Sequence, residues 1–496
     1  MELFRRYDVL IELDNVSYQY KGSDTTNLNN FSLTIQKGEC VLLCGKSGCG
    51  KTTVTKLVNG IIPYLSNGEK QGLVKLNNQN IENIPMYKLS QIVGSVFQNP
   101  KSQFFNLDTD SELTFALENQ GLPVDKIKER LEEVTNKLAI HHLRKRNIFE
   151  LSGGEKQLIA IASVYMANPE IFVLDEPTAN LDLLAIDTLK EILLYMKQEG
   201  KTILIAEHRL SYLKEIVDKV VFMENGFLKE IYTNKEFYNL SDSKRKSLGL
   251  RRLHDEIEEV SGNRYTKKEI SVCLNNISIS YGKKSILTNI SLKAHKGDII
   301  GITGSNGIGK SSLCRTICGL HSLTKGNITY SENLARIPIR LQMSYLIMQD
   351  VNHQLFGESV EDECMMNNDT ATVKQIEDIL KIMDLFSYRK KHPMALSGGQ
   401  KQRLAIAVSL LLKKDIYIFD EPTSGLDYVS MCSVREQIIS LTKKGATVFL
   451  VTHDMELLDT LCNRCLFLCS DKIVEIFRDK NNYSVHVKRM LLENRE

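Results

Sequence analysis

Two glycine-rich stretches of the chain carry the residue types that bind phosphate groups. They read "GKSGCGKT" from Gly45 and "GSNGIGKS" from Gly304, and both fit the spacing GxxxxGK[ST]. The glycines let backbone N–H groups turn inward around phosphate oxygens, and the helix that follows adds its positive end. Lys51 and Lys310 are expected to reach the outer phosphates. The hydroxyl groups placed to bind Mg²⁺ are those of Thr52 and Ser311.

Two acidic pairs follow buried apolar runs and could carry the hydrolytic chemistry. They end the stretches "FVLDE" and "YIFDE". Asp175 and Asp420 are placed to hold Mg²⁺ through water, and Glu176 and Glu421 are candidates to polarise an attacking water. A lone pair of this kind is more often a surface feature at the end of a strand. Here each pair follows a phosphate loop and precedes a histidine, which favours the chemical role.

The two histidines, His208 and His453, each lie 32 residues after the corresponding glutamate. A lone histidine is more often a structural residue than a catalytic one. Both follow β-rich runs, however, and a side chain at the carboxyl end of a strand in an α/β sheet faces the ligand crevice. We therefore expect each histidine to contact a terminal phosphate.

A third element, "LSGG", precedes a long apolar helix in each half of the chain. Ser152 and Ser397 stand before the paired glycines, so each helix N-terminus has N–H groups available to an anion. The element lies too far along the chain to belong to the phosphate loop of its own half. A simple helix cap is the alternative interpretation.

These motifs lie in two copies of one domain. Residues 29–53 match 288–312, and residues 151–182 match 396–427. Short apolar runs alternate with helical stretches, which predicts a parallel sheet covered by helices and an α/β fold class. The boundaries that we predict are residues 1–240 for the first domain, 241–268 for a polar linker and 269–496 for the second domain.

The composition limits the possible partners. The net charge is +2 and the pI about 7.9, which gives no electrostatic footprint for nucleic acid. Eleven cysteines without a paired framework are expected to be reduced thiols. No apolar run of about 18 residues is present, so a membrane role requires a partner.

Together these motifs resemble the nucleotide-binding domains of ABC ATPases over nearly the whole chain. The resemblance implies P-loop NTPase domains, each with a parallel sheet core, an antiparallel β subdomain and a helical subdomain. It also implies ATP and Mg²⁺ as cofactors and a head-to-tail pairing of the two halves, with each ATP between the P-loop of one half and the LSGG of the other. Tyr20 and Tyr281 stand where the family stacks an aromatic ring on adenine, with Tyr18 as a competing choice in the first half.

The resemblance carries over to named residues of each half. The catalytic residues would be Glu176, His208, Glu421 and His453. The nucleotide-binding residues would be Tyr20, Gly45, Lys46, Ser47, Gly48, Cys49, Gly50, Lys51, Thr52, Thr53, Gln98, Ser152, Gly153 and Gly154 in the first half, and Tyr281, Gly304, Ser305, Asn306, Gly307, Ile308, Gly309, Lys310, Ser311, Ser312, Gln349, Ser397, Gly398 and Gly399 in the second. The Mg²⁺ ligands would be Thr52, Gln98, Asp175, Ser311, Gln349 and Asp420.

Paired glutamines point to one branch of this family. "QNPKSQFF" begins at Gln98 and "QDVNHQLF" at Gln349, each with a second glutamine five residues later and an acidic residue nine residues beyond that. This pattern resembles the ATPases of energy-coupling factor (ECF) importers of vitamins and metal ions. It implies a membrane T subunit and a substrate-binding S subunit as partners. They would dock near residues 98–103 and 349–354, and the chain would lie on the cytoplasmic face of the cell membrane.

Other functions remain compatible with parts of the pattern. A polar surface loop is the alternative interpretation of the glutamine pairs. The tandem ATPase of a sugar importer has a similar length and duplication, although the glutamine pairs argue against it. A soluble ABC protein of translation or DNA repair usually has an arm insertion, zinc-binding cysteines or a basic surface, and this sequence shows none of these.

Overall fold

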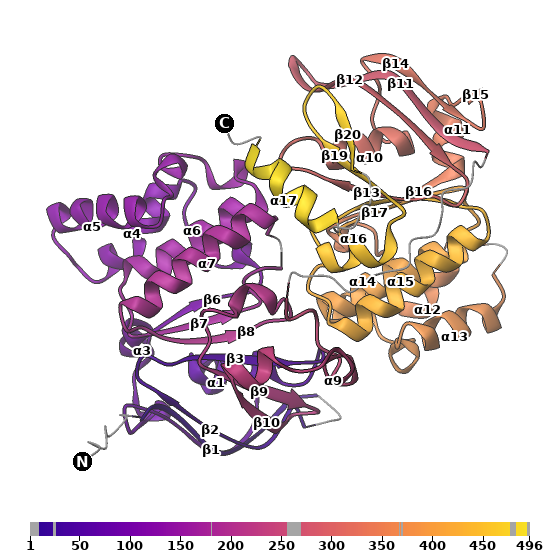
Figure 1. Cartoon of the computed structure of the whole chain (residues 1–496). Helices are drawn as coiled ribbons and strands as arrows, with labels where there is room; N and C mark the ends of the chain where they lie inside the picture. The colour runs from indigo at the N-terminus through magenta and orange to yellow at the C-terminus, as the bar shows by residue number, and fades with distance from the viewer. Residues whose placement is uncertain are drawn as a thin grey trace. The chain divides into compact units, whose positions relative to one another are not determined.

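A computed structural model describes residues 9–22, 26–179, 181–254, 269–366, 368, 371–476 and 483–493. The chain forms two compact units, residues 1–254 and 255–496 (Figure 1). Of the segment that we predict to be a linker, residues 255–268 lie outside the described part. Residues 241–254 contain a short helix, α9 (Asp242–Ser247), and the side chains of Leu250 and Leu253 join the hydrophobic core of the first unit.

The first unit has two sheets. An antiparallel sheet has the order β2-β1-β4-β5, and the main sheet has the order β10-β9-β3-β8-β7-β6. The first four strands are β1 (Val9–Tyr20), β2 (Leu28–Gln36), β4 (Gly68–Leu76) and β5 (Gln79–Asn80). The main sheet consists of β3 (Cys40–Gly45), β6 (Val93–Val96), β7 (Ile171–Asp175), β8 (Thr202–Ala206), β9 (Lys219–Glu224) and β10 (Phe227–Thr233). Five of these strands are parallel, and β10 pairs antiparallel with β9.

Helices cover both faces of this main sheet (Figure 1). On one face β3 packs with the apolar sides of α6 (Gly153–Met166) and α7 (Leu183–Gln198). On the other face it packs with α1 (Lys51–Val58) and the antiparallel sheet. Because both faces are covered, all six residues of β3 are buried, as expected for a strand inside a parallel sheet. The remaining helices of the unit are α2 (Ile61–Tyr64), α3 (Met86–Ile92), α4 (Thr109–Asn119), α5 (Val124–Lys137) and α8 (Asn234–Tyr238).

The second unit repeats this architecture. Its antiparallel sheet contains β11 (Ile270–Tyr281), β12 (Lys284–His295), β14 (Lys325–Tyr330) and β15 (Asn333–Leu334). Its main sheet runs in the order β16 (Ser344–Ile347), β17 (Ile416–Asp420), β18 (Thr447–Val451), β13 (Ile299–Thr303), β19 (Arg464–Leu468) and β20 (Ile473–Ile476). The predicted α/β class is therefore confirmed in both halves, including the antiparallel sheets and the helical segments between the glutamine pairs and LSGG.

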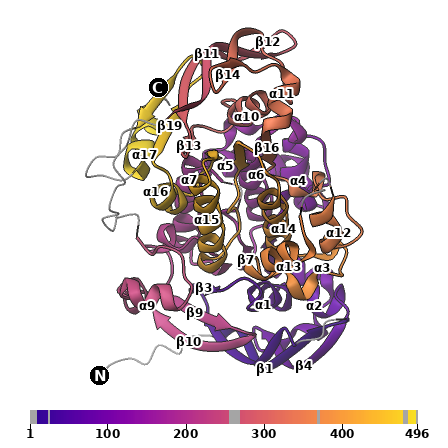
Figure 2. The same cartoon turned by 90° about the vertical axis from the view of Figure 1, so that its right-hand side faces the viewer.

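The helices of the second unit are α10 (Lys310–Cys318), α11 (Ile337–Met343), α12 (Val360–Met365), α13 (Val373–Ile382), α14 (Gly398–Leu411), α15 (Tyr428–Lys443), α16 (Met455–Leu461) and α17 (Tyr483–Glu493). Helices α14 and α15 lie side by side over the sheet (Figures 1 and 2). In the described ranges, no helix combines the length and the apolar character needed to cross a bilayer.

Candidate functional site

The glycine-rich loops connect a central strand to a helix in each unit. Gly45 ends β3 with φ 143°, and a Cβ atom there would lie 2.2 Å from the carbonyl oxygen of Met223, so only glycine fits. Lys51 begins α1 and is buried. Its Nζ donates to the carbonyl oxygens of Gly45 at 3.1 Å and Lys46 at 3.2 Å. The loop therefore surrounds an ammonium group with backbone dipoles, and an anion would meet both the charge and the helix N-terminus.

The second loop has the same construction. Gly304 has φ 146°, and Lys310 Nζ donates to its carbonyl oxygen at 2.8 Å and to that of Ser305 at 3.0 Å. The two phosphate loops predicted from the sequence thus have matching backbone and lysine geometry.

Next to each lysine, a hydroxyl group meets the aspartate of the acidic pair. Thr52 Oγ1 lies 3.2 Å from Asp175 Oδ1, and Ser311 Oγ lies 2.8 Å from Asp420 Oδ2. Burial, followed by the neighbouring glutamate, raises the pKa of Asp175 from 3.8 to about 6. Burial also raises the pKa of Asp420. Two charged or polar oxygens at this spacing suit a hard cation such as Mg²⁺.

The oxygen pairs alone do not make a complete metal site. Among the residues that the structure describes, no group of three or more His, Cys, Asp and Glu side chains is arranged to hold a metal ion. An ion bound here would therefore take further oxygens from the nucleotide and from water, which is how Mg²⁺ is usually bound beside phosphates.

Glu176, after β7, is held in a strained conformation at the centre of the first site. Its φ of 46° lies in the left-handed region, and its N–H donates to the carbonyl oxygen of Ala206 on β8 at 2.8 Å. Gln98 Nε2 donates to its Oε2 at 2.6 Å, and His208 Nε2 lies 3.4 Å from its Oε1. Burial would raise the pKa of Glu176, but the contacts with His208 and the charge of Lys51 outweigh it, so the pKa is lowered.

In the second unit Glu421 has the same backbone conformation, with φ 53°, but different contacts. Its Oε1 accepts the backbone N–H of His453 at 2.9 Å, and its Oε2 accepts Thr452 Oγ1 at 3.3 Å. The imidazole Nε2 of His453 lies 3.2 Å from Oδ1 of Asn306 in the glycine-rich loop and 3.8 Å from Glu421. Gln349 is exposed just beyond β16.

The second glutamine of each pair has a structural role that the sequence analysis missed. Gln103 Oε1 accepts the N–H of Phe97 at 3.3 Å, and its Nε2 donates to the carbonyl oxygen of Ser95 at 3.0 Å. Gln354 makes the same two contacts with Met348 and Leu346, both at 2.7 Å. Each glutamine thus ties its loop to the end of the strand before it.

The acidic residue of the pattern holds the other end of the loop. Glu112 Oε2 accepts the N–H groups of Phe105 at 3.0 Å and Asn106 at 2.9 Å. Glu363 Oε2 accepts those of Phe356 and Gly357, both at 2.6 Å. We refer to Gln103 with Glu112, and to Gln354 with Glu363, as the loop clamps.

Each loop clamp presents one aromatic ring to solvent. Phe105 is 77% exposed and Phe356 is 72% exposed, although the backbone of each is held on both sides. Singly exposed apolar side chains are common on protein surfaces, but a phenylalanine on a fixed backbone offers a partner a pre-ordered apolar contact.

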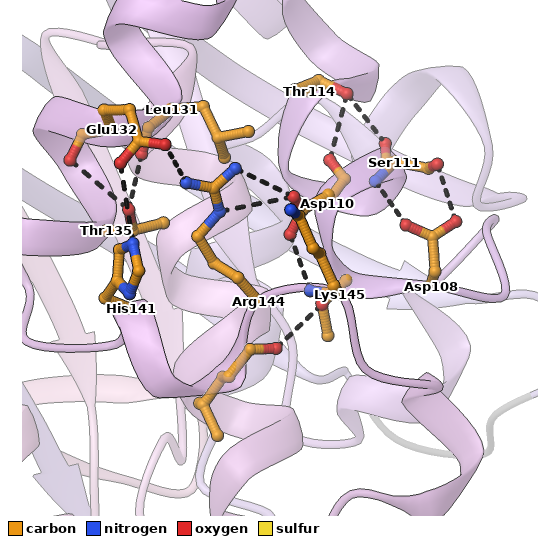
Figure 3. A network of polar contacts seen from close by, with 12 residues as sticks. Asp108, Asp110, Ser111, Thr114, Leu131, Glu132, Thr135, His141, Arg144 and Lys145 are labelled. Atoms are coloured by element: carbon orange, nitrogen blue, oxygen red, sulfur yellow. Dashed lines mark hydrogen bonds and ion pairs between the residues drawn. The ribbon is translucent and has the colours of Figure 1, made fainter.

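Polar contacts join helices α4 and α5 of the first unit (Figure 3). Arg144 donates to Asp110 on α4 and also pairs with Glu132 on α5, while the N–H of Lys145 donates to Asp110 at 2.9 Å. Asp108 caps α4 by accepting the N–H of Ser111. This network makes the segment between the glutamine pair and LSGG one connected body.

The LSGG serines begin the long helices of each unit. Ser152 and Glu155 form a reciprocal capping box on α6, and Ser397 and Gln400 do so on α14. Glu155, where the second half has glutamine, also pairs with Arg146 at 2.7 Å. The contacts of Ser152 and Ser397 described here are made within their own helix caps, and in the described residues of each unit they do not join the P-loop of that unit.

The two candidate tyrosines of the first unit differ in how deeply their side chains are buried. Tyr18 is 1% exposed and packs edge-on against Tyr20 with ring centroids 4.8 Å apart. Tyr20 is only partly buried, which favours it over Tyr18 as the ring predicted to stack on the base. Tyr281 of the second unit is 43% exposed, and its ring centroid lies 4.4 Å from that of His321.

A buried carboxylate next to each histidine was also not identified from the sequence. Glu207 precedes His208, and Asp454 follows His453; both are buried. Thr178 Oγ1 donates to Glu207 and Thr423 Oγ1 donates to Asp454, both at 2.7 Å. The available signal was an acidic residue next to each histidine, in "EHR" and in "THD".

Comparisons with known proteins agree on the family. A model described as ABC transporter matches residues 28–179 and 287–424. A relative from Treponema denticola, named provisionally as an ABC transporter ATP-binding protein, is 47% identical over 482 residues and covers 95% of this chain and 98% of its own length. A relative of the same name from Methanosarcina mazei is 31% identical, over 94% of this chain and 88% of its own length.

A solved structure is similar along both units. The archaeal ribosome recycling factor, solved with a ribosomal stalk protein, has a TM-score of 0.65 and 21% identity, and the match covers 97% of this chain and 92% of that one. At this identity the likeness concerns the fold alone.

Proposed function

Since the chain belongs to the ABC transporter family, as a tandem ATP-binding protein, we propose that it is the ATPase subunit of an ECF-type importer. Its ABC domains bind ATP with Mg²⁺ and hydrolyse ATP. In the proposal, hydrolysis energises the uptake of a vitamin or metal ion through a membrane T subunit and a substrate-binding S subunit. The chain would lie on the cytoplasmic face of the membrane and be attached through these partners.

The observation that carries this proposal is the pair of loop clamps. Both units hold a short loop by a glutamine at one end and a glutamate at the other, and both leave a phenylalanine exposed between them. The first glutamine of the same loop reaches the hydrolytic glutamate in the first unit. A loop that touches the reaction centre at one end and a partner at the other can transmit a change at the nucleotide.

The chemistry proposed for each site follows from the contacts of its side chains. Lys51 and Lys310 bind the outer phosphates from inside their loops. Thr52 with Asp175, and Ser311 with Asp420, would hold Mg²⁺, and Gln98 and Gln349 could add an amide oxygen. When bound, the ion withdraws charge from the phosphate oxygens. Glu176 and Glu421 would accept the proton of the attacking water.

The remaining residues would orient the nucleotide. His208 and His453 would contact the terminal phosphate, and Tyr20 and Tyr281 would stack on the base. We further propose that the LSGG serine and glycines of one unit, through their helix N-terminus, bind the phosphates held by the P-loop of the other. Fusion of the two units in one chain raises the effective concentration of such a pairing.

Purification from detergent-solubilised membranes tests the partner assignment. The wild-type chain is expected to bring with it multi-span membrane proteins, identified by mass spectrometry, and the double variant F105A/F356A is expected to lose them while it still binds ATP. Phe227→Ala, at a partly exposed ring on β10, is the matched control and should retain the partners. Recovery of ribosomal proteins instead would contradict the proposal and favour a translation factor.

A further inference from the structure

The residue before each histidine differs between the two units, and this difference changes the hydrogen bonds of the glutamate proposed as the base. In the first unit it is Glu207, which is 3% exposed. Its Oε1 accepts the N–H groups of His208 at 2.6 Å and Arg209 at 3.1 Å. Its Oε2 accepts Thr178 Oγ1 at 2.7 Å and Tyr212 OH at 3.4 Å. All of these groups are donors, which suits a carboxylate.

Because Glu207 accepts the backbone N–H of His208, the carboxylate of Glu176 is directed elsewhere. It lies against the Gln98 amide at 2.6 Å and the His208 imidazole at 3.4 Å. Gln98 is an exposed side chain on a loop. Its contact with Glu176 can be exchanged for one with Mg²⁺ or water, and no buried backbone group loses its partner in the exchange.

In the second unit the same position is Thr452, and the carboxylate of Glu421 takes the contact that Glu207 makes in the first. The N–H of His453 donates to Glu421 Oε1 at 2.9 Å, and Thr452 Oγ1 donates to Oε2 at 3.3 Å. Both donors are buried. Moving Glu421 away would break this hydrogen bond between two buried groups, and the cost is that of a lost hydrogen bond.

The structural reason for the difference is the position of a second carboxylate. Asp454, just after His453, accepts the hydroxyl of Thr423 and caps α16 through the N–H of Leu457. The first unit has Arg209 there, and only a 3-10 turn (Ser211–Leu213) follows. Glu207, from the other side of its histidine, therefore anchors Thr178 in that unit.

We propose that Glu207 and Thr452 are positioning residues that set the availability of the hydrolytic base, so that the site containing Glu176 hydrolyses ATP faster than the site containing Glu421. The inference rests on the proposed roles of Glu176 and Glu421. A base whose carboxylate is held by a buried N–H must first break that hydrogen bond before it can turn toward an attacking water. One charge-assisted hydrogen bond of this kind corresponds to about a tenfold difference in rate, or about 1.4 kcal/mol.

Exchanging the residues that flank the two histidines between the units tests the inference in the full chain. E207T/R209D gives the first unit the residues of the second, with an aspartate still available to Thr178. In an E421Q background this change is expected to lower kcat about tenfold with KM for ATP unchanged. T452E/D454R makes the reverse exchange, and in an E176Q background it is expected to raise kcat by a similar factor. E215T, on the exposed surface of the same segment, should change neither value.

The outcomes separate this inference from the proposed function. If the exchanges leave kcat unchanged while ATP binding is retained, the inference is wrong. If E176Q or E421Q alone already stops turnover, the exchanges are compared in the otherwise wild-type chain. E207T/R209D must still lower kcat there, and an unchanged kcat would also overturn the inference. Continued hydrolysis by E176Q/E421Q would instead refute the proposed role of the glutamates.

Discussion

Gln103→Ala removes one end of the first loop clamp and has an effect that can be estimated from its contacts. The side chain makes two hydrogen bonds with the backbone, to the N–H of Phe97 and to the carbonyl oxygen of Ser95. Each partly buried bond contributes about 1 kcal/mol, so the variant should lose about 2 kcal/mol of unfolding free energy. For a unit of this size, that loss lowers the midpoint of thermal unfolding by roughly 4–8 °C.

Thermal unfolding of the first unit, followed together with ATP binding, measures this effect. ATP binding should be retained in the folded protein, because the contacts of Gln103 are with the loop and strand rather than with Lys51 or Thr52. Gln103→Glu should be worse than alanine, since it places an oxygen against the carbonyl oxygen of Ser95. Gln120→Ala, an exposed glutamine at the end of α4, is the control and should unfold like the wild type.

The double variant Q103A/Q354A extends the test to function. With both loops loosened, it should lose membrane partners more than it loses ATP affinity. An unfolding midpoint equal to that of Gln120→Ala, together with full retention of partners, would refute the reasoning, since neither the loop nor its docking surface would then depend on the clamp.

Four further outcomes are expected. E176Q/E421Q should bind ATP but show no steady-state hydrolysis, as measured by phosphate release; sustained turnover would contradict the assignment of the bases. S397R should impair site-specific nucleotide crosslinking at Lys51 more than at Lys310, and equal loss at both would count against head-to-tail pairing. The pKa of Asp175 is raised to about 6, so below that pH Mg²⁺ must displace a proton in order to bind. The apparent affinity of the protein for Mg²⁺ should therefore fall roughly tenfold from pH 7 to pH 5. This fall should be absent from D175N. By the same linkage, the contribution of Asp175 to the stability of the Mg²⁺-free fold is present below about pH 4 and is lost as the pH rises through about 6. A wild-type protein that gains stability relative to D175N over this range would contradict this assignment.

Much of the fold could be predicted because its signals are local. Buried strands such as β3 are continuous apolar runs that end in glycine, and helices such as α6 begin with a serine that caps them. The duplication made each signal appear twice. The extent of the first unit was harder to predict, because Leu250 and Leu253 pack into its core from a segment that is rich in charged residues.

The sequence by itself determined which residue types stand at each site, because glycines, lysines, acids and histidines recur at the same spacing in both halves. Only the tertiary structure decided which partner each side chain takes. The loop clamps, the burial of Tyr18 and the different contacts of Glu176 and Glu421 all depend on groups that adjacent strands bring together. Thr178 and Glu207 are 29 residues apart in the chain, yet they meet because β7 and β8 end side by side in a parallel sheet.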